Sequence, residues 1–179
     1  MILRMRDAAF VRGGETLVAP ISLELLDGER LARTFSTARE AEIAALMACG
    51  VVRASSGTVF IGEFDPRIQP TQCKQLATCV PHEAVASEFA TLDEYVEYRA
   101  ALWGIPRAVA LERAHAALER LDGLHEAFSY PLAGALIGRP KLLVLDRPQA
   151  AYARAILSAA GACAVFSTHL VAREARAFA

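Results

Sequence analysis

The spacing of hydrophobic and polar residues along the chain predicts strands separated by helices. Residues 1–34 alternate as half-buried strands do, whereas residues 37–49 place small and apolar side chains on one helical stripe. Residues 141–146 form a continuous apolar run that ends in an aspartate, a pattern typical of a strand buried in a parallel sheet. Residues 150–160 are again helical, and residues 163–166 form a last buried strand. Strands separated by helices after an antiparallel start indicate a mixed α/β sheet.

Two further helices are predicted in the middle of the chain. Thr91 can cap the first of them, because Glu94 follows three residues later and completes a capping box. That helix extends to Gly104, and Pro106 begins the next one. We expect the second helix to direct five side chains inward: Val109, Leu111, Ala114, Leu118 and Leu121.

The length of 179 residues fits one domain. We expect residues 1–90 and 135–179 to form its core sheet and helices, and residues 91–134 a reduced helical subdomain. The 19 basic and 20 acidic residues leave a net charge of −1, which disfavours a nucleic acid as partner. The chain start lacks the apolar run of a signal peptide, and no stretch is suited to crossing a bilayer, so we expect a cytoplasmic protein.

Cysteine and lysine usage adds two constraints. The four cysteines include no CxxC pair, so we interpret them as buried thiols in a reducing compartment and expect no metal site. Lysine occurs only twice, at Lys74 and Lys141, and arginine supplies every other basic residue. A mechanism that needs a lysine before residue 74 is therefore excluded.

Seven segments of the chain match motifs of one known family, and they occur in the same order as in that family. They are Phe10, Gly28-Glu29-Arg30, residues 50–59, Cys79-Val80-Pro81, residues 91–106, residues 135–146 and Ser167-Thr168-His169. Together they resemble the ATP-binding cassette of ABC transporters, in particular its drug-export and gliding-type subgroup. The resemblance implies a P-loop NTPase-like mixed sheet with a small helical subdomain. It places nine positions in a vestigial nucleotide site: Phe10, Thr37, Arg39, Ala41, Glu42, His82, Asp146, Arg147 and His169.

The phosphate-binding loop of that family is lost in this sequence. The motif GxxxxGK[ST] uses glycine backbone N–H groups and a lysine around the phosphates, and a hydroxyl on Mg²⁺. Counting forward from Gly28 or backward from Gly50 places the loop at residues 35–43. The lysine position then holds Ala41 and the hydroxyl position holds Glu42, while the glycine positions hold Phe35, Ala38 and Glu40.

These replacements leave two interpretations of the loop. A carboxylate about 4 Å from a phosphate charge is repelled by roughly 4 kcal/mol at an effective dielectric constant near 20. Arg39 offsets only part of that repulsion. In the first interpretation, residues 38–49 are simply a helix packed on the sheet, with Glu40 and Glu42 solvated; in the second, they form a rebuilt nucleotide site.

Other positions that the resemblance ties to catalysis have changed as well. His82 replaces the Q-loop glutamine, and Arg147 replaces the glutamate that follows the Walker B aspartate, Asp146. An arginine donates protons but cannot accept one from the attacking water. Only residues 130–134 stand where the signature LSGGQ and its helix are implied. His169 matches the H-loop and is expected to be a structural remnant, and Asp146 a strand-end cap or a neighbour of Arg147.

The sequence therefore predicts a pseudo-ATPase rather than an enzyme. We expect a scaffold or regulatory subunit, without a cofactor, that forms a hetero-oligomer with an intact cassette paralogue, a membrane permease or envelope machinery at the inner face of the membrane. The alternative is a nucleotide sensor or ATP-binding subunit that binds ATP and Mg²⁺, with Phe10 on adenine, without efficient hydrolysis. Four aromatic residues are either interface anchors or core: Phe89, Tyr95, Tyr98 and Trp103.

Overall fold

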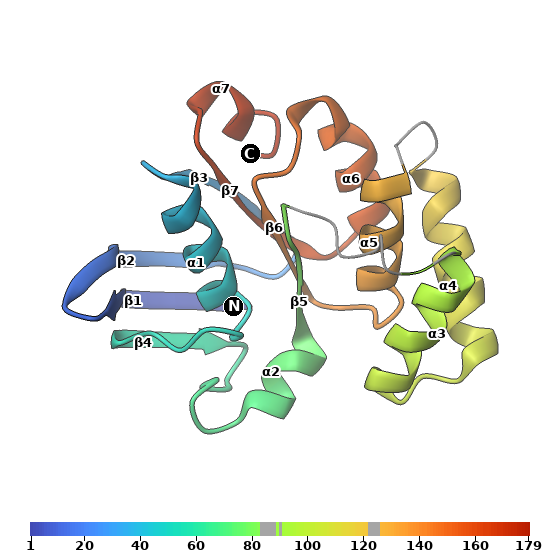
Figure 1. The fold of residues 1–179 in the computed structure, drawn as a ribbon, viewed down its shortest axis with the longest axis horizontal. Helices are drawn as coiled ribbons and strands as arrows, with labels where there is room; N and C mark the ends of the chain where they lie inside the picture. The colour runs from blue at the N-terminus through green and yellow to red at the C-terminus, as the bar shows by residue number, and fades with distance from the viewer. Residues whose placement is uncertain (83–88, 90, 122–125) are drawn as a thin grey trace.

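The computed structural model describes residues 1–82, 89, 91–121 and 126–179 (Figure 1). Its strands are β1 (Leu3–Arg12), β2 (Glu15–Leu25), β3 (Arg30–Thr34), β4 (Ser56–Ile61), β5 (Ala77–Val80), β6 (Leu142–Asp146) and β7 (Ala164–His169). Its helices are α1 (Ala38–Ala48), α2 (Pro70–Leu76), α3 (Leu92–Trp103), α4 (Arg107–Arg120), α5 (Glu126–Leu136), α6 (Ala153–Ala160) and α7 (Ala172–Ala175), with a 3₁₀ turn η2 (Ala150–Tyr152).

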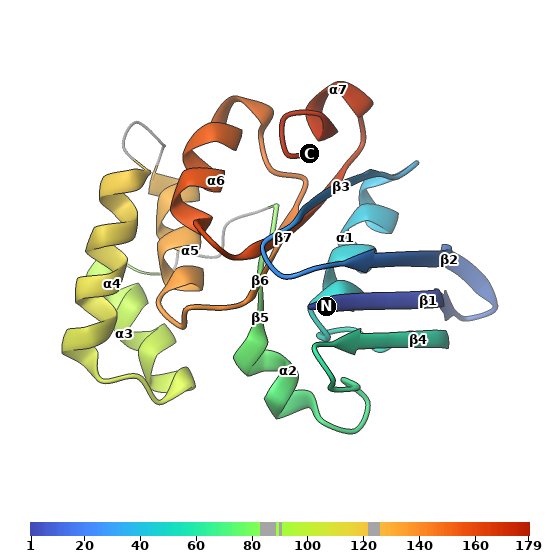
Figure 2. The ribbon, with the colours of Figure 1, turned by 180° about the vertical axis from the view of Figure 1, so that it is seen from behind.

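The strands form two sheets, which confirms the predicted mixed α/β fold. An antiparallel sheet has the order β2-β1-β4, and a parallel sheet has the order β3-β7-β6-β5 (Figures 1 and 2). In the parallel sheet, Thr34 pairs with His169, and Asp146 pairs with Thr168. Because parallel strands point the same way, the carboxyl ends of β3, β6 and β7 meet at one edge.

Helix α1 joins the two sheets into one core. It packs on strands of both sheets, and its alanines Ala41, Ala44 and Ala45 are fully buried. Their small side chains let the helix approach both sheets closely. Every residue of β6 and β7 is buried, as the apolar run in residues 141–146 predicted for a parallel strand.

Helices α3, α4 and α5 pack together beside the parallel sheet (Figure 1). Thr91 caps the helix as predicted, since its hydroxyl accepts a hydrogen bond from the Glu94 N–H at 3.2 Å. The buried stripe of α4 differs from the expected one: it consists of Ala110, Ala114 and Ala117, followed by Leu121 after the helix. Alanine lets the neighbouring helices approach closely, so the larger side chains of α4 remain only half-buried at its flanks.

Helix α5 was not predicted, because Pro131 lies inside it and proline normally interrupts a helix. Tertiary packing favours the helix here. Gly134 lies against the Tyr95 ring, where an added Cβ would come within 2.3 Å of a ring carbon.

The four cysteines are all free, and within the described residues no group of three metal-ligating side chains comes together. No helix in the described part of the chain has the length and apolarity to cross a membrane.

Candidate functional site

The connection between β3 and α1 corresponds to the loop at residues 35–43. Its helix begins with a capping box: the Thr37 hydroxyl accepts a hydrogen bond from the Glu40 N–H at 3.1 Å. The Glu40 carboxylate in turn accepts one from the Ser36 N–H at 3.0 Å. The Phe35 N–H donates to the His169 carbonyl oxygen at 2.8 Å, and the Phe35 ring is buried. The N–H groups of Phe35, Ser36 and Glu40 are therefore occupied by acceptors of the chain itself.

The lysine position lies inside the protein. The Ala41 side chain is fully buried, and its N–H donates to the Thr37 carbonyl oxygen at 3.0 Å as part of the helix. Arg39 and Glu42 are exposed near the start of α1. Residues 38–48 are thus a helix packed on the sheet, as the first interpretation expected. Glu40, however, is half-buried and hydrogen-bonded rather than simply solvated.

The sequence contains a local signal for this arrangement in addition to the register of the loop. Thr37-Ala38-Arg39-Glu40 has the T-x-x-E spacing of a capping box and directly precedes a helical stripe. In its usual form the glutamate reaches back to the N–H of the capping residue. Here it reaches one residue further, to Ser36. The pattern predicts a helix start that satisfies its own amides.

Asp146 is held in a bidentate ion pair at the end of β6. The Arg147 guanidinium donates to both carboxylate oxygens, at 2.8 and 2.9 Å, and the Thr168 hydroxyl donates to one of them at 3.1 Å. The Asp146 side chain is 3% exposed and that of Arg147 17%. Asp146 is therefore an Arg147 neighbour at a strand end, as expected.

The backbone at Arg147 connects this pair to His82. Arg147 adopts φ +47°, a left-handed conformation that residues other than glycine rarely occupy. Its N–H donates to the Thr168 carbonyl oxygen at 3.0 Å. Its own carbonyl oxygen lies 3.0 Å from Nδ1 of His82, at hydrogen-bond distance. His82, Asp146 and Arg147 thus form one connected network at the carboxyl edge of the parallel sheet.

His169 is completely buried at the end of β7. Its Nε2 is 2.9 Å from the Ser167 hydroxyl, and the Phe178 ring covers the imidazole with a centroid distance of 5.2 Å. Nδ1 is buried and has no hydrogen-bond partner among the described residues. Burial lowers the pKa of His169, and the Glu174 carboxylate opposes this shift only in part. Burial therefore favours the neutral form of the imidazole.

We expect this histidine to make the stability of the protein depend on pH. Because the pKa of His169 is lower in the folded than in the unfolded state, the unfolded state binds more protons below the ordinary value of 6.5. Stability should fall as the pH decreases from there, by at most about 1.4 kcal/mol per pH unit for one group. Urea unfolding at several pH values gives the free energy of unfolding as a function of pH. Below pH 6.5 this free energy should fall less steeply for His169→Phe than for the wild-type protein. Equal slopes for both proteins would contradict this assignment.

Phe10 lies in the other sheet, whereas the signature segment borders the network, since its Leu132 lines a small cavity together with Asp146. Phe10 belongs to β1 of the antiparallel sheet, pairs with Val18 and is half-buried against the main core. Residues 130–134 are part of α5, and the preceding Ser129 is buried at 4% exposure. The structure thus brings together the loop, His82, Asp146, Arg147 and His169, while Phe10 contributes to the core.

A cavity of about 410 Å³ lies beside the loop. It is lined by Ala19, Pro20, Ile21, Arg33, Thr34, Phe35, Ser36, Glu40, Leu170 and Ala172. The cation of Arg33 lies over the Phe35 ring at 5.9 Å, and the Glu40 carboxylate faces the same space. The volume falls within the range of small-molecule sites.

No family model matches the chain, and no curated protein matches its sequence. Solved structures do match its fold. An ATP-binding subunit of an ABC transporter superposes with a TM-score of 0.78 at 17% identity, covering 99% of this chain and 83% of that one. This chain has the fold of an ABC-type ATP-binding cassette. Two other solved cassettes have a similar fold.

The first is cbiO1 from Clostridium perfringens, part of the ABC transporter complex cbiONQ. It matches with a TM-score of 0.72 at 18% identity, covering 94% of this chain and 78% of that one. The second is MJ0796, a bacterial ABC transporter cassette solved as a dimer. It matches with a TM-score of 0.76 at 14% identity, covering 99% of this chain and 91% of that one. The cassette fold is thus matched over nearly the whole chain.

Proposed function

We propose that this chain is a catalytically degenerate ATP-binding cassette that acts as a scaffold or regulatory subunit. In this role it pairs with an intact cassette or docks on a membrane permease or envelope assembly. It requires neither ATP nor Mg²⁺. The observation that carries the proposal is the capping box at residues 36–40, because it fills the phosphate loop with the protein's own carboxylate.

The charges around the loop support the proposal. A phosphate must compete with the Glu40 carboxylate for the Ser36 N–H and would meet the like charge at close range. The buried Ala41 methyl group supplies no cation. A helix N-terminus binds anions when its amides are free, and here the amides of Ser36 and Glu40 are hydrogen-bonded within the chain.

The residues at the positions that the family uses for Mg²⁺ and the attacking water also support the proposal. Both oxygens of Asp146 accept hydrogen bonds from Arg147, so a cation at this carboxylate would have to displace a guanidinium. Arg147 cannot act as a general base. The imidazole of His169 is buried beneath Phe178. The residues present therefore do not fit MgATP as a P-loop site holds it, and they supply no hydrolytic step.

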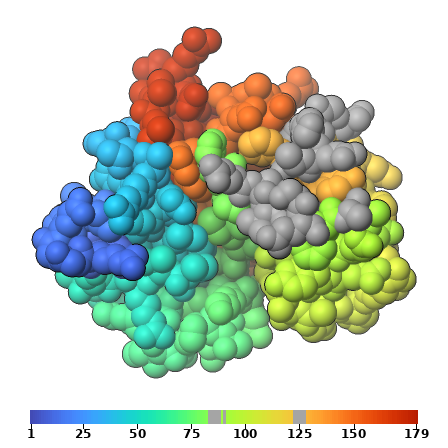
Figure 3. Space-filling view, in the orientation of Figure 1, coloured from blue at the N-terminus to red at the C-terminus, as the bar shows by residue number. Residues whose placement is uncertain are grey.

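A groove between α2 and α3 supports the role in assembly. It has a volume of about 700 Å³ and is open at the surface between the green α2 and the yellow-green α3 (Figure 3). Val51 and Leu102, two of its lining residues, are 59% and 61% exposed. Lys74 and Arg99 add positive charge, and Arg99 lies 5.5 Å from the Trp103 ring. A partner segment with apolar and acidic side chains fits this groove.

The aromatic cluster divides between core and surface. Tyr95 is 8% exposed and contacts Gly134, so it belongs to the core. Tyr98 is 51% exposed, and the Phe89 ring lies 5.4 Å from Tyr95 and 5.3 Å from Tyr98. Tyr98 therefore remains available to a partner, whereas Tyr95 does not.

Calorimetric titration with ATP and Mg²⁺, together with a phosphate-release assay, tests the proposal. We expect no binding in the micromolar range and no phosphate release. Release that Asp146→Asn abolishes, with folding of the variant verified by circular dichroism, would show that the chain is an ATPase. Release that persists in Asp146→Asn and does not scale with the amount of purified chain identifies a contaminating enzyme; release that persists and does scale with it would also overturn the proposal.

The second candidate function is a nucleotide sensor, which the cavity of about 410 Å³ beside the loop favours. Arg33, Thr34 and Ser36 line the cavity with side chains that can donate hydrogen bonds to an anionic ligand. Micromolar ATP binding without phosphate release, weakened by Arg33→Ala, would establish the sensor and overturn a purely scaffolding role.

The docking groove gives a separate prediction for assembly. Leu102→Asp should reduce the fraction of chain that sediments with the membranes of its native cells by about fivefold or more, because it places a charge where an apolar contact is lost. Leu26→Asp is the matched control, since Leu26 is 48% exposed and lies outside the groove. The groove is not the docking surface if both variants sediment alike.

A further inference from the structure

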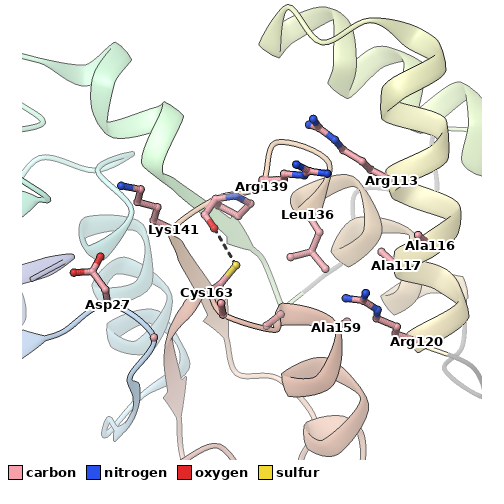
Figure 4. Close-up of a pocket in the computed structure, with 14 residues that line it drawn as sticks. Asp27, Arg113, Ala116, Ala117, Arg120, Leu136, Arg139, Lys141, Ala159 and Cys163 are labelled. Atoms are coloured by element: carbon pink, nitrogen blue, oxygen red, sulfur yellow. Dashed lines mark hydrogen bonds between the residues drawn. The ribbon is translucent and has the colours of Figure 1, made fainter.

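A second cavity lies at the opposite edge of the parallel sheet, where the strands begin. Its walls come from residues 27–28 before β3, residues 139–141 before β6, residues 159–163 before β7, and one face of α4 (Figure 4). Its volume is about 550 Å³, within the range of small-molecule sites. It shares no lining residue with the cavity beside the loop.

Positive charge dominates this cavity. Arg113 and Arg120 project from α4, and Arg139 and Lys141 from the connection between α5 and β6 (Figure 4). Among the described residues, Asp27 is the one acidic residue in the lining. The Met1 amino group donates a hydrogen bond to Asp27 at 3.1 Å and is the main cause of its lowered pKa.

None of the three arginines forms an ion pair within the described part of the chain, whereas the charge of Lys141 helps to lower the pKa of Asp27. One terminal nitrogen of Arg113 donates to the Ile137 carbonyl oxygen at 2.7 Å, while its Nε is buried without a described partner. Like charges that line one cavity repel one another, and a bound anion relieves that repulsion. The cavity is therefore suited to an anion.

The backbone at Arg139 is strained in a way that fits such a role. Arg139 has φ +51°, the left-handed conformation, which costs a residue other than glycine about 1 kcal/mol or more. This conformation lies between Gly138 and Pro140, and the Pro140 carbonyl oxygen accepts a hydrogen bond from the Cys163 thiol at 2.9 Å (Figure 4). The contact fixes the connection that presents Arg139 and Lys141 to the cavity.

Apolar side chains form most of the remaining lining. They are Ala116, Ala117, Leu136, Pro140, Ala159, Ala160 and Ala162. An apolar lining with a few charged groups selects a ligand that has an apolar body and an anionic end. Phosphate suits arginine because the planar guanidinium donates two parallel hydrogen bonds to it.

We propose that this cavity binds a small organic phosphate, with the phosphate between Arg113, Arg120 and Arg139 and the apolar body against the alanines of α4 and α6. The site lies at the sheet edge opposite the nucleotide-site positions. It does not depend on whether the cassette has lost its ATPase activity.

Calorimetric titration of the full chain with 1-naphthyl phosphate tests the proposal. We expect micromolar binding at low salt, about tenfold tighter than that of inorganic phosphate or of 1-naphthol, because the site uses both charge and apolar surface. Arg120→Gln and Arg139→Gln should each weaken it about tenfold, the cost of one hydrogen bond to a charged group. Added salt should also weaken it.

Two control variants locate the binding site. Arg154→Gln removes the same charge from the exposed start of α6, and Arg39→Gln removes it from the phosphate loop. Neither should change the affinity. Binding that Arg39→Gln weakens as much as Arg139→Gln would place the ligand elsewhere and overturn the proposal. Absence of micromolar binding, equal affinity for 1-naphthol, or an equal loss in Arg154→Gln would overturn it as well.

Discussion

Replacing Arg147 with methionine is expected to lower the free energy of unfolding by about 3–5 kcal/mol. The Asp146 carboxylate is 3% exposed and would lose both hydrogen bonds from the guanidinium, with the Thr168 hydroxyl left as its described side-chain donor. A buried carboxylate without its cation is costly because the interior solvates charge poorly. Urea unfolding of the wild-type protein and the variant measures the difference.

The double variant Asp146→Leu, Arg147→Met separates the ion pair from the packing. Removing both charges leaves no buried ion, so we expect the double variant to be considerably more stable than Arg147→Met alone. Arg154→Met, at an exposed position on α6, should have little effect. If the single and double variants are equally unstable, the ion pair is not the cause.

The ion pair between Asp146 and Arg147 also affects whether a glutamate can be restored at position 147. Arg147→Glu would introduce the glutamate that the resemblance implies after Asp146. It would also place a second carboxylate beside a buried one, where like charges repel strongly. We therefore expect this variant to be at least as unstable as Arg147→Met. One substitution would then restore the aspartate–glutamate pair of the family only in an unstable protein.

Truncating Phe178 to alanine is expected to cost about 3–5 kcal/mol. The ring is fully buried and covers His169, and its removal leaves a cavity over the imidazole. Acylation of His169 by diethyl pyrocarbonate, followed by peptide mass spectrometry, should become faster at the same time. Phe178→Leu keeps most of the volume and should show a smaller change in both measurements.

The result for Phe178 also bears on the proposed function. If stability and His169 reactivity both remain at wild-type values in Phe178→Ala, the ring does not seal the histidine. If the variant behaves as expected, the histidine is released only when the segment after β7 detaches. A phosphate would then reach the imidazole only after this segment detaches. Such a histidine is poorly suited to sense a bound nucleotide.

Much of the fold was predictable because its signals are local. The apolar run of residues 141–146 predicts a parallel strand, and Thr91 with Glu94 predicts a helix start. Helix α5 was missed because Pro131 gives a local signal against it, and contacts such as that of Gly134 with Tyr95 outweigh that signal. The buried face of α4 consists of alanines, and only the neighbouring helices decide how closely they pack.

The lack of a lysine at position 41 and the arginine after Asp146 can be read along the chain, because these facts depend only on residue order. The closure of Asp146 by Arg147 and Thr168, and the cover of Phe178 over His169, became evident only in the folded protein. Folding also brought four distant basic residues around one cavity at the opposite edge. These contacts join residues far apart in sequence, and parallel strand pairing and core packing bring them together.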